Sequence, residues 1–279
     1  MSAELTIVIP TYNNAQGAID LVKDFYRMYD PEMFRIISID QTVDGIKFEN
    51  PIHLHIKPYR NLGFSKAMNV GLKLSQTKYT LLANDDVRLL DKRWYEDIKK
   101  CLDHEDVLAV NPFPALRTWD GGGNPVWYWQ KNEKFLWTKD KPYESYTPEE
   151  YDRLLKELCG GNGNGTTMFF TLIKTEARDI IGYLDEAYWC GGEDYDWNRR
   201  CFIKGYKILT CQHSLVHHES SVSKQNAVKA KEAIGYELVS KNKNIFNAKW
   251  KSEDCTNPDI YGKSGSIEPN LPWYIEQPL

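Results

Sequence analysis

Short apolar runs alternate with amphipathic helices over the first 86 residues, and this alternation constrains the fold most strongly. Apolar residues on both faces of the runs at 5–9, 34–39 and 79–83 predict strands that are covered on two sides. Residues 15–29 have apolar side chains at helical spacing, and a further short strand is expected at 53–56, followed by a helix. The resulting order, βαββαβ, predicts an α/β sheet and is typical of a nucleotide-binding half-domain.

The strand expected at 79–83 stops abruptly at three polar residues, Asn84, Asp85 and Asp86. Ligands of α/β sheets collect beyond the carboxyl ends of the strands, which makes this triplet a candidate site. Two adjacent carboxylates repel each other, so we expect a cation between them and an anionic ligand. Mg²⁺ or Mn²⁺ holding a diphosphate fits, because both ions prefer oxygen ligands and share them with substrate phosphates. The alternative is an ordinary Asn-Asp turn with a helix cap.

Polar residues also follow the other expected strands. Asp40 ends the second strand, where a turn carboxylate and a ligand contact are equally good interpretations. A turn at Gly63 leads into a helix that Ser65 is expected to cap. Lys66 and Asn69 lie three residues apart on one face of that helix. A helix N-terminus with a nearby lysine would suit an anion.

The stretch at 111–165 breaks the strand-helix pattern with prolines, glycines and aromatic residues. We expect a long binding loop here, with one helix at 148–158, and we expect it to select the substrate. A strand at 166–173 and a helix at 176–181 return to the earlier pattern. A polar helix is expected at 224–247, before a tail rich in Pro, Gly and Ser.

A second dense polar stretch begins after the glycine pair at 191–192, which frees the backbone. Asp194 follows this pair, and a carboxylate beside an open, aromatic-lined cavity can accept a proton from a hydroxyl as a general base. Glu193 and Asp196 are explained at least equally well as ordinary acids of a first helical turn.

A histidine pair, His217 and His218, follows the strand expected at 206–211. A neutral imidazole is a good third ligand for Mn²⁺ beside carboxylates. The alternative is that both histidines are simply polar surface residues. The pair is therefore a candidate for completing a metal site with the acidic triplet.

Composition and missing motifs exclude several function classes. The net charge is −4 and the pI is about 5.9, so no general basic field for nucleic acid or anionic membrane is present. Six cysteines without CxxC spacing argue against a zinc cluster. Neither a GxGxxG after the first strand nor a GxxxxGK[ST] loop occurs, which removes most support for dinucleotide and P-loop chemistry. The sequence has no signal-like start and no membrane-length apolar run, so we expect a soluble, cytoplasmic protein.

Four motifs together resemble the family 2 glycosyltransferases, which have the single-domain GT-A fold that binds nucleotide sugars. TIVIPTYNN is similar to the opening strand and loop of that family, and NLGFSKAMNVGL is similar to its Asn-x-Gly helix. KYTLLANDDV resembles the strand with the metal-binding acidic triplet. IGYLDEAYWCGGEDYDWNRRCFIKGYKI resembles the segment that carries the catalytic base, especially in the rhamnosyltransferase-like branch. The resemblance covers roughly residues 5–86 and 166–223.

The resemblance implies roles for particular residues. It implies nucleotide-sugar binding by Thr11, Tyr12, Asn13, Asp40, Asn61, Lys66, Asn69, Asn84 and Asp85. It makes Asp86 the main ligand of Mn²⁺ or Mg²⁺, with His217 or His218 as a further ligand, and Asp194 the catalytic base. It implies acceptor-side positions for Trp189, Glu193 and Asp196. The chain departs from the family pattern at Asn84, where many relatives have Asp, and at Met68, where Arg is common.

The expected protein is an inverting, metal-dependent hexosyl- or pentosyltransferase that moves a sugar from a nucleoside diphosphate sugar, UDP above others, to a hydroxyl. A glycan, a lipid-linked glycan, a protein and a modified DNA base all stay open as acceptors. We expect a mostly parallel sheet flanked by helices in one GT-A domain at 1–223. Within it, 1–110 is the nucleotide-binding half, 111–165 the aromatic excursion and 166–223 the acceptor half, and 224–279 is a C-terminal extension. The alternatives are a nucleotidyltransferase and a non-catalytic carbohydrate-binding protein.

Overall fold

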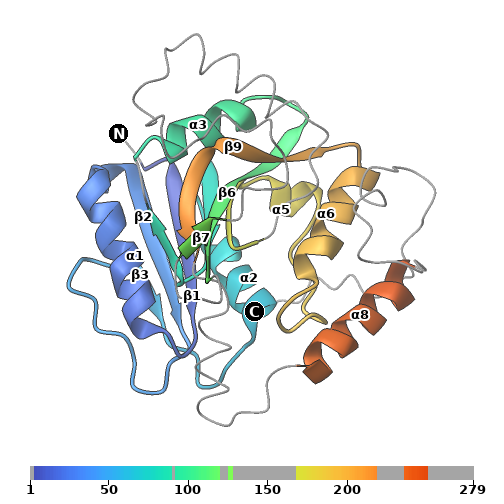
Figure 1. Cartoon of the computed structure of the whole chain (residues 1–279), viewed down its shortest axis with the longest axis horizontal. Coiled ribbons are helices and arrows are strands. Elements are labelled where there is room, and N and C mark those ends of the chain that lie inside the picture. Colours follow the sequence, from blue (N-terminus) through green and yellow to red (C-terminus); the bar gives the residue numbers. More distant parts are fainter. Residues whose placement is uncertain (1–2, 90–91, 120–124, 128–167, 219–235, 251–279) are drawn as a thin grey trace.

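A sheet with helices on both faces organises the described part of the chain (Figure 1), which is residues 3–89, 92–119, 125–127, 168–218 and 236–250 of a computed structural model. The strands are β1 (Leu5–Thr11), β2 (Phe34–Asp40), β3 (Leu54–Ile56), β4 (Tyr79–Ala83), β5 (Val87–Leu89), β6 (Val107–Trp119), β7 (Pro125–Trp127), β8 (Phe170–Lys174) and β9 (Lys207–His218). The helices are α1 (Ala15–Met28), the 3-10 helix η1 (Pro31–Met33), α2 (Phe64–Leu74), α3 (Trp94–Leu102), α5 (Ala177–Ile180), α6 (Glu193–Ile203) and α8 (Tyr236–Trp250).

The strand order is β3-β2-β1-β4-β8-β6-β9-β5, and β7 pairs with β6. The strands β3, β2, β1 and β4 are parallel, so their carboxyl ends meet at one edge of the sheet. In the second half β8 is antiparallel to both of its neighbours, whereas β6 and β9 are parallel to each other. The predicted α/β class and its βαββαβ opening are confirmed.

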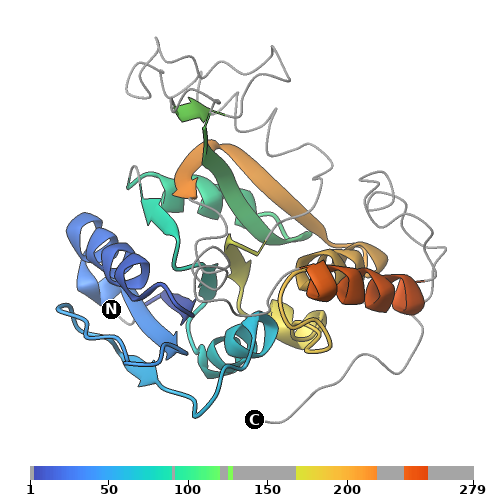
Figure 2. The ribbon, with the colours of Figure 1, turned by 60° about the horizontal axis from the view of Figure 1, so that its bottom comes forward.

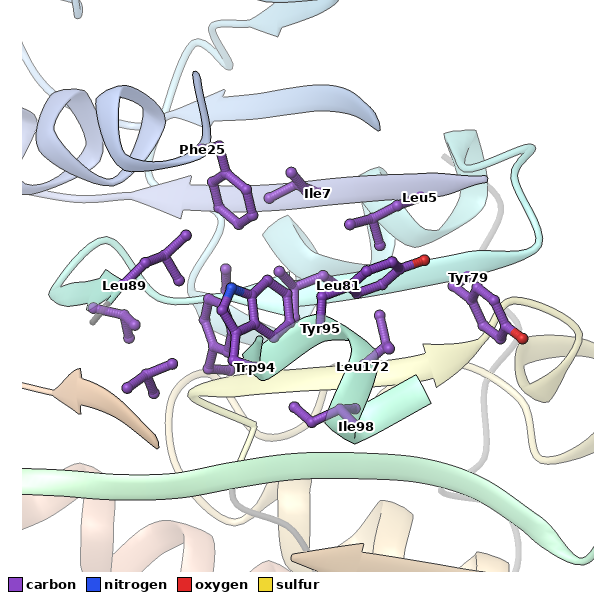
Figure 3. Packing of buried hydrophobic residues seen from close by; sticks show 14 of the residues in the cluster. Leu5, Ile7, Phe25, Tyr79, Leu81, Leu89, Trp94, Tyr95, Ile98 and Leu172 are labelled. Carbon is purple, nitrogen blue, oxygen red and sulfur yellow. The ribbon is translucent and has the colours of Figure 1, made fainter. Parts of the chain in front are cut away.

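Side chains along β1 point alternately to the two faces of the sheet, and a separate layer of helices covers each face. Leu5, Ile7 and Ile9 point into a core that α1 and α3 cover, with Trp94 and Phe25 among the buried rings of that core (Figure 3). Residues of the opposite parity, such as Val8, pack against α2, α5 and α6. Figure 2 shows these two layers from a second direction. Burial on both faces explains why the strands are apolar almost throughout.

Strand β6 runs on to Trp119, although the prolines and glycines of the stretch at 111–165 predict that a loop begins at residue 111. Two of the prolines behind this prediction, Pro112 and Pro114, lie where a missing backbone N–H removes few hydrogen bonds from the sheet. The pairing of β6 with β8 ends at Val110, and a register shift between Pro112 and Phe113 interrupts the pairing with β9. Proline is tolerated at such irregular or one-sided positions, because a missing N–H costs little there. The prediction that the loop excursion begins at residue 111 is therefore wrong.

Several smaller expectations also differ from the structure. Ser65 does not cap α2, because its hydroxyl donates to the carbonyl of Tyr188, and the capping position is occupied by Gly63. Strand β9 is longer than predicted and includes both histidines of the pair. The last helix occupies Tyr236–Trp250 rather than ending at residue 247. The helix expected at 148–158 lies outside the described residues.

Candidate functional site at the carboxyl edge of the sheet

Asp86 and His218 face each other although 132 positions separate them in the sequence. Strand β5 pairs with β9 antiparallel, and Val87 lies opposite His218 in that pairing. As a result Nε2 of His218 lies 3.1 Å from Oδ1 of Asp86. The imidazole also stacks on Phe169, with the ring centroids 4.6 Å apart. His217 lies opposite Arg88 in the same pairing, so of the two histidines it is His218 that the structure brings to Asp86.

The donor atoms around Asp86 fit a divalent cation. Adjacent ligands of an octahedral ion with bonds of about 2.1 Å are about 3.0 Å apart, close to the separation of Asp86 Oδ1 and His218 Nε2. Two further oxygens, Oδ1 of Asn84 and Oδ2 of Asp85, are buried and have no hydrogen-bond partner among the described residues. Within the same part of the chain no group of three or more His, Cys, Asp or Glu side chains could hold a metal by itself. The site therefore suits an ion that completes its shell with phosphate or water oxygens.

The acidic turn is fixed from the side of β1 and α1. The side-chain amide of Asn14 donates to both the carbonyl and Oδ1 of Asp85, each at 3.2 Å, and the backbone N–H of Tyr12 also bonds Asp85. Gly17 approaches the turn so closely that an added Cβ would lie 2.2 Å from the carbonyl oxygen of Asp85. Burial and the neighbouring charge of Asp86 raise the pKa of Asp85 well above its usual value. Asn14 and Gly17 were not among the predicted site residues, although Asn14 is the last residue of the TIVIPTYNN motif.

The last residue of β1, Thr11, and the loop that follows it, with Tyr12 and Asn13, lie beside this turn. Thr11 is fully buried, and its hydroxyl has no hydrogen-bond partner within the described ranges. Asn13 adopts a left-handed backbone conformation with φ of 55°, which reverses the chain before α1 begins. The structure thus brings the predicted β1 loop and the predicted acidic triplet together at one edge of the sheet.

Asp40 lies at the same edge but organises its own loop. The carboxylate is fully buried and accepts hydrogen bonds from the N–H and hydroxyl of Thr42 and from the N–H of Ile46, with Nε2 of His55 at 3.2 Å. Burial alone would raise the pKa of Asp40, but these hydrogen bonds lower it below its usual value. The turn interpretation of Asp40 describes this geometry, because the contacts surround both carboxylate oxygens.

Asp40→Asn is expected to destabilise the protein by about 1–3 kcal/mol at pH 7, because an amide cannot accept at both oxygens. The stabilisation by the wild-type carboxylate is present above its unfolded-state pKa of about 3.9 and is lost as the pH falls through the lower folded-state pKa. Urea unfolding of both proteins between pH 7 and pH 2.5 measures this. The difference should shrink below about pH 4, and a constant difference over that range would contradict the assignment.

The three predicted polar residues of the α2 region make mostly structural contacts. Oδ1 of Asn61 accepts the N–H of Gly63 at 2.8 Å and so closes the turn before α2. The amide of Asn69 exchanges two hydrogen bonds with the backbone of Leu184, at 2.8 and 2.9 Å. Lys66 lies 3.5 Å from Oε2 of Glu186. The contacts of Asn69 and Lys66 connect the N-terminal half to residues more than 110 positions later, whereas the contact of Asn61 is local.

The segment at 184–189 is thereby attached to the first turn of α2. The N–H of Phe64 donates to the carbonyl of Trp189 at 2.6 Å, next to the bond from Ser65 to Tyr188. The indole of Trp189 covers Gly63 so closely that a Cβ there would lie 1.7 Å from Cδ1, yet 43% of Trp189 is exposed. Because α2 begins beyond the carboxyl end of β3, this segment lies at the same edge of the sheet as the acidic turn.

Asp194 lies in the first turn of α6, two residues after the second of two left-handed glycines, Gly191 and Gly192. Its side chain is half-buried, and Oδ1 accepts the N–H of Tyr195 at 2.9 Å. Glu193, by contrast, is buried, with 5% of its surface exposed. Of the first two acids of α6, the more accessible one is thus the predicted base.

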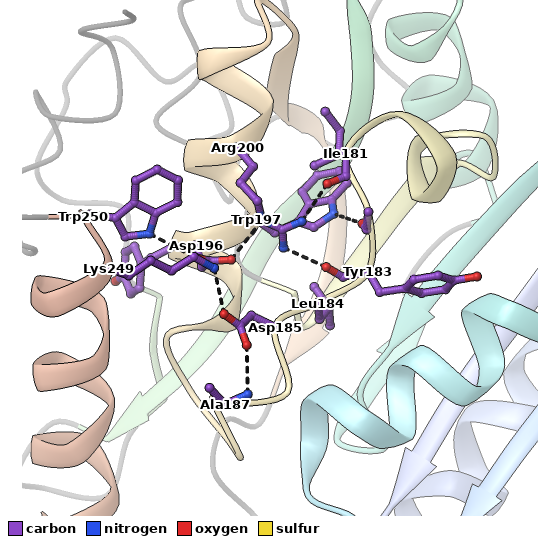
Figure 4. Close-up of polar contacts among 12 residues, drawn as sticks. Ile181, Tyr183, Leu184, Asp185, Ala187, Asp196, Trp197, Arg200, Lys249 and Trp250 are labelled. Carbon is purple, nitrogen blue, oxygen red and sulfur yellow. Dashed lines mark hydrogen bonds and ion pairs between the residues drawn. The ribbon is translucent and has the colours of Figure 1, made fainter. Parts of the chain in front are cut away.

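Asp196 is fully buried in a network of charges, so its geometry favours a structural role over contact with an acceptor (Figure 4). Oδ2 lies 3.0 Å from Nε of Arg200, and Oδ1 accepts from Nε1 of Trp250 at 2.9 Å. Lys249 lies 2.8 Å from the same Oδ1 and 2.7 Å from Oδ2 of Asp185. Lys249 and Trp250 were not predicted as site residues, because they lie after residue 247, where the helix expected from the sequence ends.

Comparison with known proteins identifies the family. The model of a protein family described as glycosyl transferase family 2 matches residues 6–169. This chain belongs to glycosyl transferase family 2. The match includes the β1 loop and the acidic turn, and it ends at Phe169, the ring on which His218 stacks. No curated protein matches the chain in a sequence search.

Solved glycosyltransferases share the fold of this family 2 member at low sequence identity. The mannosyltransferase PcManGT from Pyrobaculum calidifontis, in complex with GDP-Man and Mn²⁺, has a TM-score of 0.55 and 11% identity over 88% of this chain and 70% of its own. S. aureus TarS 1-349 has a TM-score of 0.50 and 13% identity over 88% and 72%. GalNAc-T7 with UDP, GalNAc and Mn²⁺ has a TM-score of 0.52 and 15% identity over 89% and 50%. The expected GT-A fold is therefore confirmed.

No helix in the described ranges is both long and apolar enough to cross a membrane.

Proposed function

We propose that this family 2 protein is an inverting, metal-dependent glycosyltransferase that uses a UDP-sugar and transfers the sugar to a hydroxyl. The observation that carries the proposal is the Asp86–His218 pair, 3.1 Å apart at the edge where the parallel strands end. Solved neighbours of the same fold support it, because they were crystallised with GDP-Man and Mn²⁺, with UDP and Mn²⁺, or with UDP-GlcNAc. Mn²⁺ or Mg²⁺ bound by Asp86 and His218 would neutralise charge that develops on the leaving diphosphate.

In the proposed reaction Asp194 accepts the proton of the acceptor hydroxyl. The hydroxyl oxygen attacks the anomeric carbon from the face opposite the nucleotide, so a new glycosidic bond forms as the bond to the diphosphate breaks. The nucleoside diphosphate leaves with the electron pair of the broken bond, and the configuration at the anomeric carbon inverts. The β1 loop, at Thr11, Tyr12 and Asn13, is proposed to hold the nucleotide, and Asn84 and Asp85 are proposed to line the diphosphate.

The more specific parts of the proposal, the branch of the family and the contact with the acceptor, rest on residues in the second half of the chain. We propose that the protein belongs to the rhamnosyltransferase-like branch, because the sequence pattern of residues 181–208 resembles that branch. Trp189, exposed beside Gly63, is proposed to contact the acceptor. We propose a catalytic domain at 1–223 with an extension at 224–279. Within this scheme the sugar is a hexose or pentose, and glycans, lipid-linked glycans, proteins and modified DNA bases are the acceptor classes to be screened.

A thermal-shift panel of nucleotide sugars with and without Mn²⁺ tests the proposal. A UDP-sugar at about 100 times its Kd should stabilise the folded protein by about 2.7 kcal/mol, which corresponds to about 5–10 °C for a domain of this size. The shift should need Mn²⁺. Asp86→Asn should remove the Mn²⁺-dependent part, because it replaces a charged ligand by a neutral amide. Asp103→Asn, at an exposed aspartate after α3, is the control and should keep the full shift.

Two outcomes of the panel would overturn the proposal. Stabilisation by free sugars with no response to any nucleotide would indicate a carbohydrate-binding protein. A nucleotide response whose product, by mass spectrometry, carries a transferred nucleotidyl group instead of a sugar would indicate a nucleotidyltransferase.

A further inference from the structure

Helix α8 holds the loop that precedes the proposed base. The side-chain amide of Asn242 donates to the carbonyl of Cys190 at 2.8 Å and to the carbonyl of Gly191. Asn242 is buried, with 6% of its surface exposed. A buried amide that donates to two successive carbonyls fixes both the position and the orientation of that stretch of backbone.

The loop needs such a contact because its two glycines allow the backbone to adopt many conformations. Gly191 and Gly192 have φ values of 87° and 97°, a region that glycine enters at no steric cost and leaves as easily. Gly192 also forms the start of α6, and no side chain caps the helix there. The place of Asp194, two residues later, therefore depends on what holds the glycine pair from outside.

Other residues of α8 fix the flanks of the same loop. Phe246 and Trp250 pack with Tyr188, just before the glycine pair. Trp250 and Lys249 bind Asp196, two residues after Asp194. The contacts of α8, including those of Asn242, thus involve residues on both sides of the proposed base in the sequence. The region matched by the family model ends at residue 169, so this helix lies outside that region.

We propose that Asn242 is a positioning residue that sets the location of Asp194 through the carbonyls of Cys190 and Gly191. The expected effect on catalysis rests on the proposed function, whereas the expected effect on the structure of the loop does not. It assigns the C-terminal helix to the acceptor side of the site. The residues that bind the diphosphate lie on other elements, so the contact of Asn242 should affect the chemical step and leave nucleotide binding unchanged.

Asn242→Asp tests the proposal, because aspartate has the same shape and cannot donate to a carbonyl when it is charged. Asn242→Gln keeps the amide donors, and Asn244→Asp makes the same change at an exposed position of α8. The donor is the UDP-sugar that stabilises the wild type most in the panel above, and its Mn²⁺-dependent hydrolysis is the activity, with water as acceptor. Asn242→Asp should lower hydrolysis at least about tenfold and leave the Kd of UDP within about twofold, as expected when only the general base is displaced.

Hydrogen exchange gives a readout that is independent of catalysis. Amides at 188–197 should exchange at least about tenfold faster in Asn242→Asp, whereas β1 and β4 should not change. Asn242→Gln should restore part of the activity, and Asn244→Asp should match the wild type in both assays. Unchanged exchange at 188–197, or faster exchange throughout with weaker UDP binding, would overturn the proposal. A wild type that neither binds nor hydrolyses any nucleotide sugar would instead refute the proposed function, while the exchange data still decide whether Asn242 holds the loop.

Discussion

Lys249→Met is expected to lower the free energy of unfolding by about 3–5 kcal/mol, the usual cost of removing one partner of a buried ion pair. Nζ of Lys249 lies 2.7 Å from Oδ2 of Asp185 and 2.8 Å from Oδ1 of Asp196, and about 1% of the lysine side chain is exposed. Methionine has a similar length but no charge, so two buried carboxylates would lose their shared cation. Asp196 would keep Arg200, whereas Asp185 has no second ion pair among the described residues. Urea unfolding monitored by tryptophan fluorescence measures the change.

Lys241→Met is the matched control, since it makes the same substitution at an exposed lysine of the same helix. It should change the stability by less than about 0.5 kcal/mol. In the Lys249→Met background, Asp185→Asn should recover part of the loss, because it removes the carboxylate that is left without a cation. A Lys249→Met protein as stable as the control would show that α8 does not dock on α6 in solution.

Asp194→Asn is expected to reduce sugar transfer by about 10²–10⁴-fold, the usual contribution of a positioned general base. The amide retains the shape of the side chain, and its oxygen can still accept the N–H of Tyr195. Binding of UDP in the presence of Mn²⁺ should therefore be unchanged. The measurement pairs release of UDP from the best donor, as kcat, with calorimetric titration of UDP.

The control for Asp194→Asn is Asp179→Asn, at a residue of α5 whose side chain is 73% exposed. It should leave both the kcat and the Kd of UDP unaltered. If Asp194→Asn turned over the donor at the wild-type rate, another group would be the base. If it weakened UDP binding as much as it slowed turnover, its role would be in donor binding instead.

The first half of the fold could be predicted because three of its strands, β1, β2 and β4, are covered on both faces and are followed by or end in polar residues. The runs that become β1, β2 and β4 are apolar almost throughout, and this pattern is hard to produce in another fold. Strand β6 could not be predicted to its end. Whether Pro112 and Pro114 break a strand depends on where its partners stop pairing, which is a property of β8 and β9.

Some parts of the candidate site could be predicted from the sequence, and others could not. Asp86 and a histidine of the pair were expected together, because the family resemblance links them, and the structure brings His218 to Asp86. Local patterns also singled out Asp194, which the structure shows to be half-buried after the glycine pair, and its role as base stays a prediction. The contacts of Asn69 and Lys249 were not predictable, since their partners lie 115 and 64 positions away in the sequence. Such partners are set by the docking of α2 and α8.

Diffraction from crystals soaked with Mn²⁺ and a UDP-sugar, measured at a wavelength where manganese scatters anomalously, tests the central claim most directly. We expect one anomalous peak within about 2.3 Å of both Asp86 and His218, in contact with the diphosphate, and a sugar whose anomeric carbon faces Asp194. A metal bound away from Asp86, or a sugar on the far side of the molecule from Asp194, would contradict it.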